Sequence, residues 1–355
     1  MTEVKILIFG ATGYIGGSVL ASLIKSSDSK IRDCKITAPV RKELHAARLR
    51  DLQIESPIFE GLDDLDFIQS IASSHDIVIN AASTFYPGVA KAIVQGLEKR
   101  QKLTGRQGHL LQTSGTGSVA DRRTSQRLVE NKVLSDKDDI YEYLKFREHG
   151  ESFPQRLTDV TTIEAGDAMG VKTYILMSPT IYGPGKGLFN RKSMQIQALV
   201  DLAFKEQYTS VVGSGDGEWN HVHIEDMCSL YELIVSRLLK GDELPSNKKG
   251  IYFNETGSES WLTVSRNIGK VGKQMGLLPT EEVTHISLEE ASTKLSTNLM
   301  ANISVDVIEL GWASWSRTKA DLAREIGWTP TKTRDDFLAT FKELWVEAQE
   351  ANSVK

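Results

Sequence analysis

The residues best suited to chemistry follow a short apolar run at the start of the chain. Gly10, Gly13 and Gly16 stand three residues apart in "GATGYIG", after "VKILIF" and before a segment with apolar residues at helical spacing. Glycines between a strand and a helix let the backbone approach a pyrophosphate, and the helix N-terminus offers free N–H groups to the anion. The spacing therefore predicts a dinucleotide-binding turn.

The end of the second expected strand indicates which dinucleotide is bound. In "ITAPVRKELHAARL" the strand runs into Arg41 and Lys42 with no carboxylate before them. An NAD site usually has an acidic residue there for the ribose hydroxyls, whereas an NADP site has a cation near the 2′-phosphate. The sequence favours NADP(H) over NAD(H), with a solvated pair of charges as the alternative.

Other candidate side chains lie outside the glycine turn. Tyr86 would stand at the mouth of the cleft, where it could donate to a substrate oxygen or simply cap a helix. His221 and His223 alternate on an expected strand, with Asp226 nearby; we interpret them as structural rather than as a metal pair, because a fourth ligand is missing. Trp219 and Trp261 could form the floor of a substrate pocket or could simply pack in the hydrophobic core. No metal site is predicted.

These side chains need a scaffold, and the hydrophobic pattern predicts an α/β fold. Apolar runs typical of buried strands alternate with helical segments, which favours a doubly wound parallel (Rossmann) sheet with ligands at the carboxyl ends of its strands. The expected strands are residues 4–10, 35–40, 56–61, 76–82, 109–115 and 172–179, and the clearest helices are residues 64–73, 89–103 and 158–169.

The rhythm changes after Pro184. We expect residues 1–181 to form mainly the NAD(P)-binding domain, and residues 182–355 mainly a smaller C-terminal substrate-binding lobe with segments that return to the main sheet. The polar residues 120–153 are expected to form a long surface excursion.

Bulk properties exclude several classes of protein. The 355 residues are 40% hydrophobic and 25% charged, with a formal net charge of -5 and scattered cations. This gives no electrostatic footprint for nucleic acid or an anionic membrane, and no apolar stretch is long enough to span a bilayer. Two distant cysteines, Cys34 and Cys228, argue against a disulfide framework. A cytoplasmic protein acting on a small molecule is expected.

Six motifs in order along the whole chain resemble the extended short-chain dehydrogenase/reductase family, which contains NAD(P)-dependent epimerases, dehydratases and reductases. They are "GATGYIG", "DIVINAAS", "LLQTSGTGSV", "SPTIYGPGKG", "WNHVHIEDM" and "WSRTKADLAREIGWTP". The resemblance implies a cofactor-binding set of Gly10, Thr12, Gly13, Tyr14, Ile15, Gly16, Arg41, Leu62, Ala81, Ala82, Ser83, Pro179, Thr180 and Ile181. The family aspartate before the adenine is Gly61 here, so that contact is not carried over.

The resemblance also implies a catalytic serine or threonine, and a tyrosine whose pKa is lowered by a lysine four residues later. Ser114 is the best match to the first, with Thr116 as an alternate hydroxyl. In the window expected for the pair, the chain has no Tyr-x-x-x-Lys; Gln155 and Asp159 stand roughly in those places. An upstream match, Tyr141 and Lys145, is the candidate catalytic pair, although Gly150 and Pro154 soon interrupt its helix.

The sequence therefore predicts an NADP-dependent oxidoreductase that reduces a small carbonyl or imine metabolite with a non-standard proton donor. One alternative is a non-catalytic NADP-binding sensor, similar to the nitrogen-metabolite-repressor-like proteins; another is a nucleotide-sugar epimerase or dehydratase. The family also suggests a homodimer. The candidate substrate-contacting residues are Tyr86, Thr116, Tyr182, Trp219 and His221.

Overall fold

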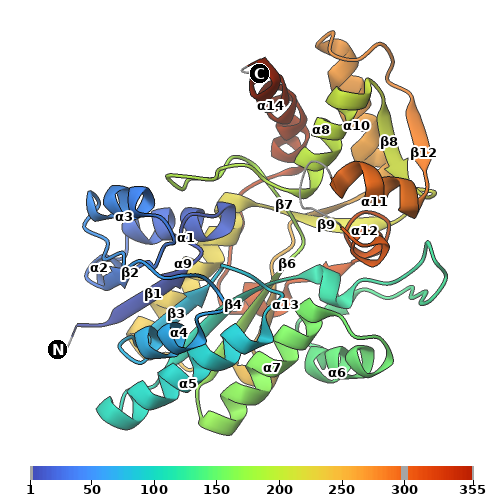
Figure 1. The fold of residues 1–355 in the computed structure, drawn as a ribbon. Helices are drawn as coiled ribbons and strands as arrows, with labels where there is room; N and C mark the ends of the chain where they lie inside the picture. The colour runs from blue at the N-terminus through green and yellow to red at the C-terminus, as the bar shows by residue number, and fades with distance from the viewer. Residues whose placement is uncertain (1–2, 297–302, 354–355) are drawn as a thin grey trace.

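The computed structural model describes residues 3–296 and 303–353, and its centre is one parallel sheet (Figure 1). Within these ranges the sheet has six strands in the order β10-β6-β4-β3-β1-β2. This confirms the predicted doubly wound parallel α/β fold, because the order runs outward in both directions from β1 and β3. The strands are β1 (Lys5–Phe9), β2 (Lys35–Thr37), β3 (Ile77–Asn80), β4 (His109–Gly115), β6 (Lys172–Ser178) and β10 (Ile251–Phe253).

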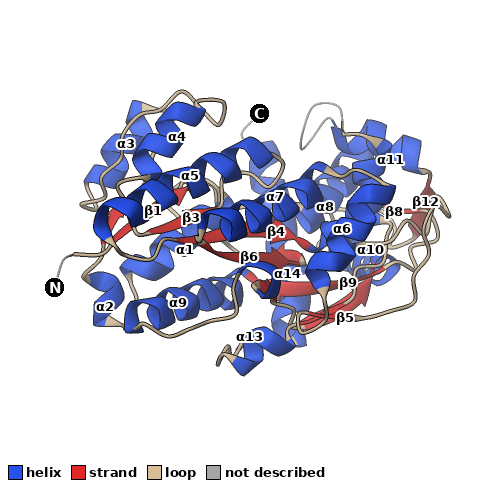
Figure 2. Cartoon of the chain, turned by 90° about the horizontal axis from the view of Figure 1, so that it is seen from below, coloured by secondary structure: helices blue, strands red, loops and turns tan. Residues whose placement is uncertain are grey.

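Helices cover both faces of this sheet (Figure 2). On one face α1 (Tyr14–Ile24) packs against α9 (Ile224–Lys240); on the other, α5 (Pro87–Thr104) lies between α4 (Leu65–Ala72) and α7 (Pro154–Met169). One hydrophobic cluster joins α1 and α9 to the sheet and extends to α7, and another joins α4 and α5 to it, so both faces are buried, as nearly unbroken apolar strands require.

The later part of the chain builds a second body around another hydrophobic cluster. Its strands are β7 (Thr180–Tyr182), β9 (Glu218–His223) and β11 (Gly257–Ser260) in one sheet, and β8 (Thr209–Val212) with β12 (Val283–Ile286) in another. Its helices are α8 (Gln195–Glu206), α10 (Trp261–Gln274), α11 (Leu288–Ser296), α12 (Val305–Trp312) and α14 (Arg334–Ser353). Because α9 and β10 join the main sheet, the chain crosses between the two bodies; the boundary at residue 182 stays a prediction.

The expected strand at residues 56–61 does not form. Only isolated bridges join Glu55 to Thr37 and Ile58 to Val40. Pro57 has no N–H to donate, so a continuous ladder beside β2 would be broken at this residue.

Residues 120–153 are more structured than the predicted surface excursion. They contain β5 (Leu134–Ser135), which pairs with β13 (Thr318–Lys319), and α6 (Ile140–Gly150). Arg122, 1% exposed, ties the segment to α12 through Glu309 and also contacts Glu151. The remaining short elements are α2 (Ser29–Arg32), α3 (Glu43–Arg50), η1 (Thr116–Val119), η2 (Asn247–Lys249) and α13 (Asp321–Glu325).

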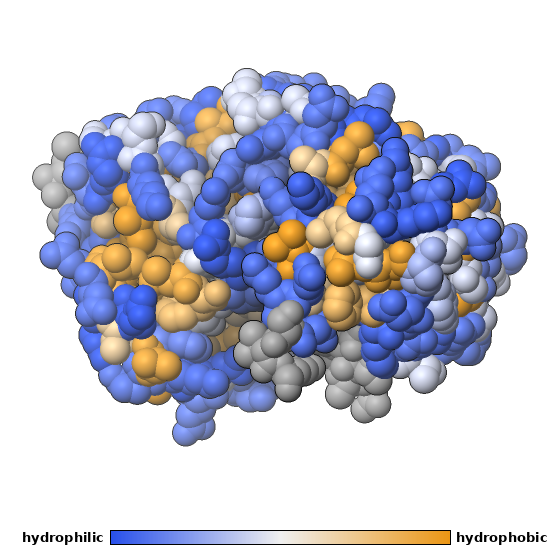
Figure 3. Space-filling view, turned by 90° about the horizontal axis from the view of Figure 1, so that it is seen from above, coloured by the Kyte–Doolittle hydropathy of each residue, from blue (hydrophilic) through white to orange (hydrophobic). Residues whose placement is uncertain are grey.

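The surface is mostly polar on the face drawn in Figure 3, where apolar side chains gather in two separate areas. Among residues 3–296 and 303–353, none of the helices combines the length and apolar character needed to cross a bilayer.

Candidate functional site

The turn after β1 has a backbone geometry that requires glycine. Gly10 has a φ of +85°, and a Cβ on it would lie 2.5 Å from the carbonyl oxygen of Ala81. A Cβ on Gly16 would lie 2.3 Å from the carbonyl oxygen of Gly10. The turn is therefore packed between the end of β3 and the start of α1, and larger residues would force the backbone apart.

The N-terminus of α1 is free to receive an anion. Its N-cap residue is Gly13, which has no side chain to cap the helix, and the first turn contains no acidic residue. The first N–H groups of a helix have no partner within the helix, and the helix dipole places partial positive charge there. These residues fit a pyrophosphate group, and the approach of its oxygens is not blocked by a Cβ at Gly13.

A loop from the second body lies against this turn (Figure 1). The Tyr14 hydroxyl donates to the carbonyl oxygen of Gly183 at 2.7 Å, and the Lys186 N–H donates to Ser18 Oγ at 3.0 Å. Gly17 and Gly187 pack backbone to backbone, since a Cβ on Gly187 would lie 2.9 Å from Gly17. The loop between β7 and α8 is thereby fixed beside the glycine turn.

Several other residues predicted to contact the cofactor lie after the carboxyl ends of neighbouring strands. Arg41 is exposed just beyond β2, and the half-buried Ala81, Ala82 and Ser83 follow β3. Pro179, Thr180 and Ile181 follow β6, and Leu62 packs against the cluster around α4 and α5. Parallel strands end at one edge of the sheet, so Gly10 and the residues after β2, β3 and β6 share that edge, whereas Leu62 follows no strand of this sheet.

At the end of β4, Ser114 is paired with a buried carboxyl group. Ser114 Oγ and Ser118 Oγ each donate to Oδ2 of Asp159 at 2.8 Å. Asp159 is 0% exposed, and its Oδ1 has no hydrogen-bond partner among the described residues. Burial raises the pKa of Asp159 to about 7, although the two serine hydroxyls and the charge of Arg156 act to lower it. This carboxyl group can gain and lose a proton near neutral pH.

Gln155 lies one helical turn before Asp159 and connects α7 to the loop after β3. Its Nε2 donates to Thr84 Oγ1 at 2.9 Å, and a Cβ on Gly115 would lie 3.1 Å from it. An amide at this place can donate a hydrogen bond but does not give up a proton near neutral pH. That Gln155 and Asp159 replace the family tyrosine and lysine stays a prediction from the resemblance.

The structure does not bring Tyr141 and Lys145 to Ser114. The Tyr141 hydroxyl donates to Glu164 Oε1 at 3.0 Å, and Lys145 forms an ion pair with the same carboxylate at 3.2 Å. Glu164 is five residues after Asp159, which places the two side chains about 140° apart around the helix axis. Burial and Glu164 raise the pKa of Tyr141 and outweigh Lys145, which acts to lower it, so the net shift is opposite to that of an activated tyrosine.

The residues predicted to contact substrate fall into two groups. Tyr86 is 46% exposed at the N-cap of α5, after β3, and the Thr116 hydroxyl is buried near Ser114 in sequence without a partner among the described residues. Tyr182, Trp219 and His221 lie in or against the second hydrophobic cluster.

His221 is held as a neutral packing residue. Its ring stacks on Phe337 with centroids 4.0 Å apart, and burial lowers the pKa of His221 to about 4. Trp219 Nε1 donates to Ser314 Oγ. Asp226 accepts the backbone N–H groups of Thr331 and Lys332, so its carboxylate fixes the chain before α14. No group of three or more possible metal ligands occurs in residues 3–296 and 303–353.

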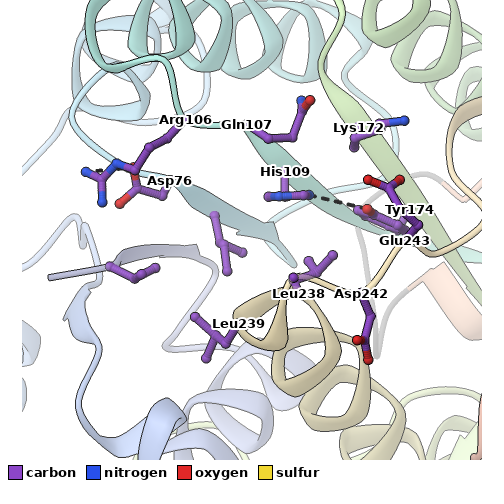
Figure 4. A pocket seen from close by; sticks show the side chains of 13 residues that line it. Asp76, Arg106, Gln107, His109, Lys172, Tyr174, Leu238, Leu239, Asp242 and Glu243 are labelled. Atoms are coloured by element: carbon purple, nitrogen blue, oxygen red, sulfur yellow. Dashed lines mark hydrogen bonds and ion pairs between the residues drawn. The ribbon is translucent and has the colours of Figure 1, made fainter. Parts of the chain in front are cut away.

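A cavity of about 310 Å³ lies at the opposite edge of the sheet (Figure 4). It is lined by Asp76, His109, Lys172 and Tyr174, which stand at or near the amino ends of β3, β4 and β6. The Asp76 carboxylate forms ion pairs with Arg100 and Arg106. His109 contacts the Tyr174 hydroxyl at 3.3 Å. The cavity is therefore separate from the edge that carries the glycine turn and Ser114.

Sequence reasoning missed Ser118 and Thr84. Ser118 lies in a short 3-10 turn while Ser114 lies in β4, so their spacing of four residues gave no signal that both hydroxyls reach one carboxyl group. Thr84 left no signal either, because its partner Gln155 is 71 residues away.

Comparison with known sequences finds relatives of about one-quarter identity. No family model matches the chain. It is 26% identical over 300 residues to the oxidase ucsJ of an Acremonium species, covering 81% of this chain and 84% of that protein. An uncharacterised protein of Schizosaccharomyces pombe is 24% identical over 334 residues, covering 92% and 95%.

Solved structures resemble the whole chain. The NAD complex of a dTDP-glucose 4,6-dehydratase from Bacillus anthracis has a TM-score of 0.64 at 13% identity and covers 98% of each chain. A UDP-glucose 4-epimerase from Thermotoga maritima has a TM-score of 0.61 at 15% identity and covers 98% of this chain and 100% of its own. The chain has the Rossmann-type fold of the NAD-dependent epimerases and dehydratases, which confirms the predicted resemblance at the level of the fold.

Proposed function

We propose that this protein is an NADP-dependent oxidoreductase that reduces a small carbonyl or imine metabolite. The proposal is carried by the N-terminus of α1, which has no side-chain cap and follows a turn where Gly10 and Gly16 leave no room for a Cβ. This turn lies at the same edge of the sheet as Ser114. A pyrophosphate on α1 would direct the rest of a dinucleotide along the carboxyl ends of the strands. The NAD complex of the dehydratase and the name of the oxidase relative support a nicotinamide cofactor.

The bound dinucleotide would supply the hydride that becomes the new C–H bond of the substrate. The chain's own residues would bind and orient. Ser114 would hold the substrate oxygen at the end of β4, and the exposed rings of Phe85 and Tyr86 would contact the substrate at the mouth. The loop that begins at Gly183 would hold the glycine turn in place.

The preference for NADP(H) rests on Arg41. Its guanidinium is exposed beyond β2, and residues 35–40 contain no acid that would accept the ribose hydroxyls. A 2′-phosphate on the adenosine ribose pairs well with a guanidinium, which offers two parallel donors.

A second candidate is a dinucleotide sensor without turnover. The observation that favours it is that the buried Gln155 amide, which cannot act as a proton donor in the reaction, lies beside Gly115 next to Ser114. A site of this kind could bind the dinucleotide and signal its redox state without transferring a hydride.

The test is binding followed by turnover. NADPH and NADH are titrated by fluorescence, and NADPH oxidation is then followed across a panel of aldehydes, ketones and cyclic imines. Gly16→Ala should abolish binding, whereas Gly150→Ala, where a Cβ meets nothing within 4 Å, should leave it intact. Tight NADPH binding without turnover would favour the sensor, and failure to bind either dinucleotide would refute both functions.

A further inference from the structure

Asp159 is a buried carboxyl group that has no cationic partner among the described residues. It is an aspartate on the sheet-facing side of α7, 0% exposed, and no ion pair of its carboxylate is found in the described parts of the chain. Arg156, on the same helix, directs its guanidinium to the backbone oxygens of Ser118 and Glu151 instead. A buried carboxylate without a cation is costly, and the cost falls when the group takes up a proton.

The hydrogen bonds of Asp159 lead toward the candidate reaction centre. Ser114 and Ser118 share Oδ2, each at 2.8 Å, while Oδ1 has no partner among the described residues. As a carboxylate, Asp159 accepts from the Ser114 hydroxyl. As a carboxylic acid with its proton on Oδ2, it donates to Ser114 Oγ, and the Ser114 proton is then free to point to a ligand. The same contact can therefore carry a proton in either direction.

We propose that Asp159 is the proton source of the site and that Ser114 relays its proton to the substrate oxygen. This rests on the proposed reductase function. Gln155, which is buried beside Gly115 one turn before Asp159, would orient the substrate or the ribose, since its amide can donate a hydrogen bond without being consumed. Ser118 would be a positioning residue that fixes Oδ2 beneath Ser114.

The step balances as a reduction of a carbonyl group. The substrate carbon gains a hydride, and the electron pair of the C=O double bond moves to oxygen. That oxygen takes the proton of Ser114 Oγ, and Ser114 takes the proton of Asp159, which becomes a carboxylate. The substrate leaves as an alcohol, NADPH as NADP⁺, and Asp159 is reprotonated from solvent.

The electrostatic surroundings suit this role at neutral pH. Burial raises the pKa of Asp159 to about 7, and the groups that oppose burial are the hydroxyls of Ser114 on β4 and Ser118 on η1, and the positive charge of Arg156. A general acid is most effective when its pKa lies near the working pH. Tyr141, by contrast, has its pKa raised and its hydroxyl bound to Glu164.

Asp159→Asn tests the proposal in the full-length protein. We expect NADPH affinity within about twofold of wild type and a kcat lowered by roughly 100-fold or more, the usual contribution of a general acid. The wild-type kcat should fall as the pH rises through about 7, because the acid form of Asp159 is lost. Asp201→Asn is the matched control: this half-buried carboxyl group on α8 also has a raised pKa, but it contacts Gln197 in the second body.

Ser118→Ala separates proton transfer from mere structural support. Loss of this hydroxyl removes a bond that favours the carboxylate, so the midpoint of the pH–kcat profile should move to higher pH. The proton relay would be overturned if Asp159→Asn kept the kcat of the wild-type protein, or if the pH midpoint of Ser118→Ala did not move. The proposed reductase function would survive either result. A wild-type protein that binds NADPH but reduces none of the panel would instead refute the proposed function, and the relay with it.

Discussion

Replacing Asp159 by asparagine should change how the stability of the protein depends on pH, whether or not a substrate is known. The pKa of Asp159 is about 7 in the folded protein, against an ordinary value of 3.8. The folded state therefore binds this proton more tightly than the unfolded state does. The free energy of unfolding should rise as the pH falls from about 8 toward 4, and this contribution should be absent above about pH 8.

The magnitude follows from the two pKa values. Linkage between a folded pKa of about 7 and an unfolded value of 3.8 gives about 2.5 kcal/mol of added stability when the pH falls from 8 to 5. Asparagine does not titrate, so Asp159→Asn should lack this gain. The difference between the two proteins, rather than either curve alone, isolates Asp159 from Asp136, whose pKa burial also raises to about 7.

The assay is urea unfolding of both proteins, followed by tryptophan fluorescence, at pH 5, 6, 7 and 8. The urea midpoint of the wild-type protein should rise relative to that of the variant as the pH falls, so the two midpoints should converge or cross. Parallel curves, with a constant difference from pH 5 to 8, would mean that Asp159 is ionised throughout this range. The proton-source argument would then fail on thermodynamic grounds, independently of kinetics.

Three further predictions concern the turn, the cofactor and the upstream tyrosine. Gly10→Val should unfold the turn or abolish NADPH binding, because the side chain would meet the Ala81 backbone, and circular dichroism with fluorescence titration checks both outcomes. Arg41→Ala should weaken NADPH binding by roughly tenfold or more while changing NADH binding little, since only NADPH carries the 2′-phosphate; equal losses would remove Arg41 from the preference. Tyr141→Phe should cost about 1 kcal/mol of stability by losing its bond to Glu164. The variant should also keep NADPH turnover in the carbonyl panel, and loss of turnover would return Tyr141 to the catalytic role.

The site combines a rigid part with a part that can change state. The glycine turn is locked by backbone contacts, and the loop from Gly183 is bonded to Tyr14 and Ser18. Asp159 and Ser114 can exchange a proton without moving, since a separation of 2.8 Å suits either direction of donation. Reduction at such a site would need no tyrosine, because the buried carboxyl group would take up a new proton from solvent after each turnover.

The sequence determined the elements that depend on local spacing. Nearly unbroken apolar runs predicted five of the six strands that the described residues place in the main sheet, all but β10, and "GATGYIG" predicted a tight turn before α1, because both follow from neighbours in the chain. Gly150 and Pro154 correctly separated α6 from α7, since proline at the first helical position starts a new helix. The strand expected around Pro57 was wrong because the missing N–H outweighs a short apolar run.

Only the tertiary structure decided which side chains meet. Ser114 and Asp159 are 45 residues apart, and their contact depends on how α7 docks against β4. The docking of α6 likewise determines that Tyr141 reaches Glu164, on another side of α7 from Asp159. The raised pKa of Asp159 follows from burial, a property of the packed molecule that no spacing of residues encodes.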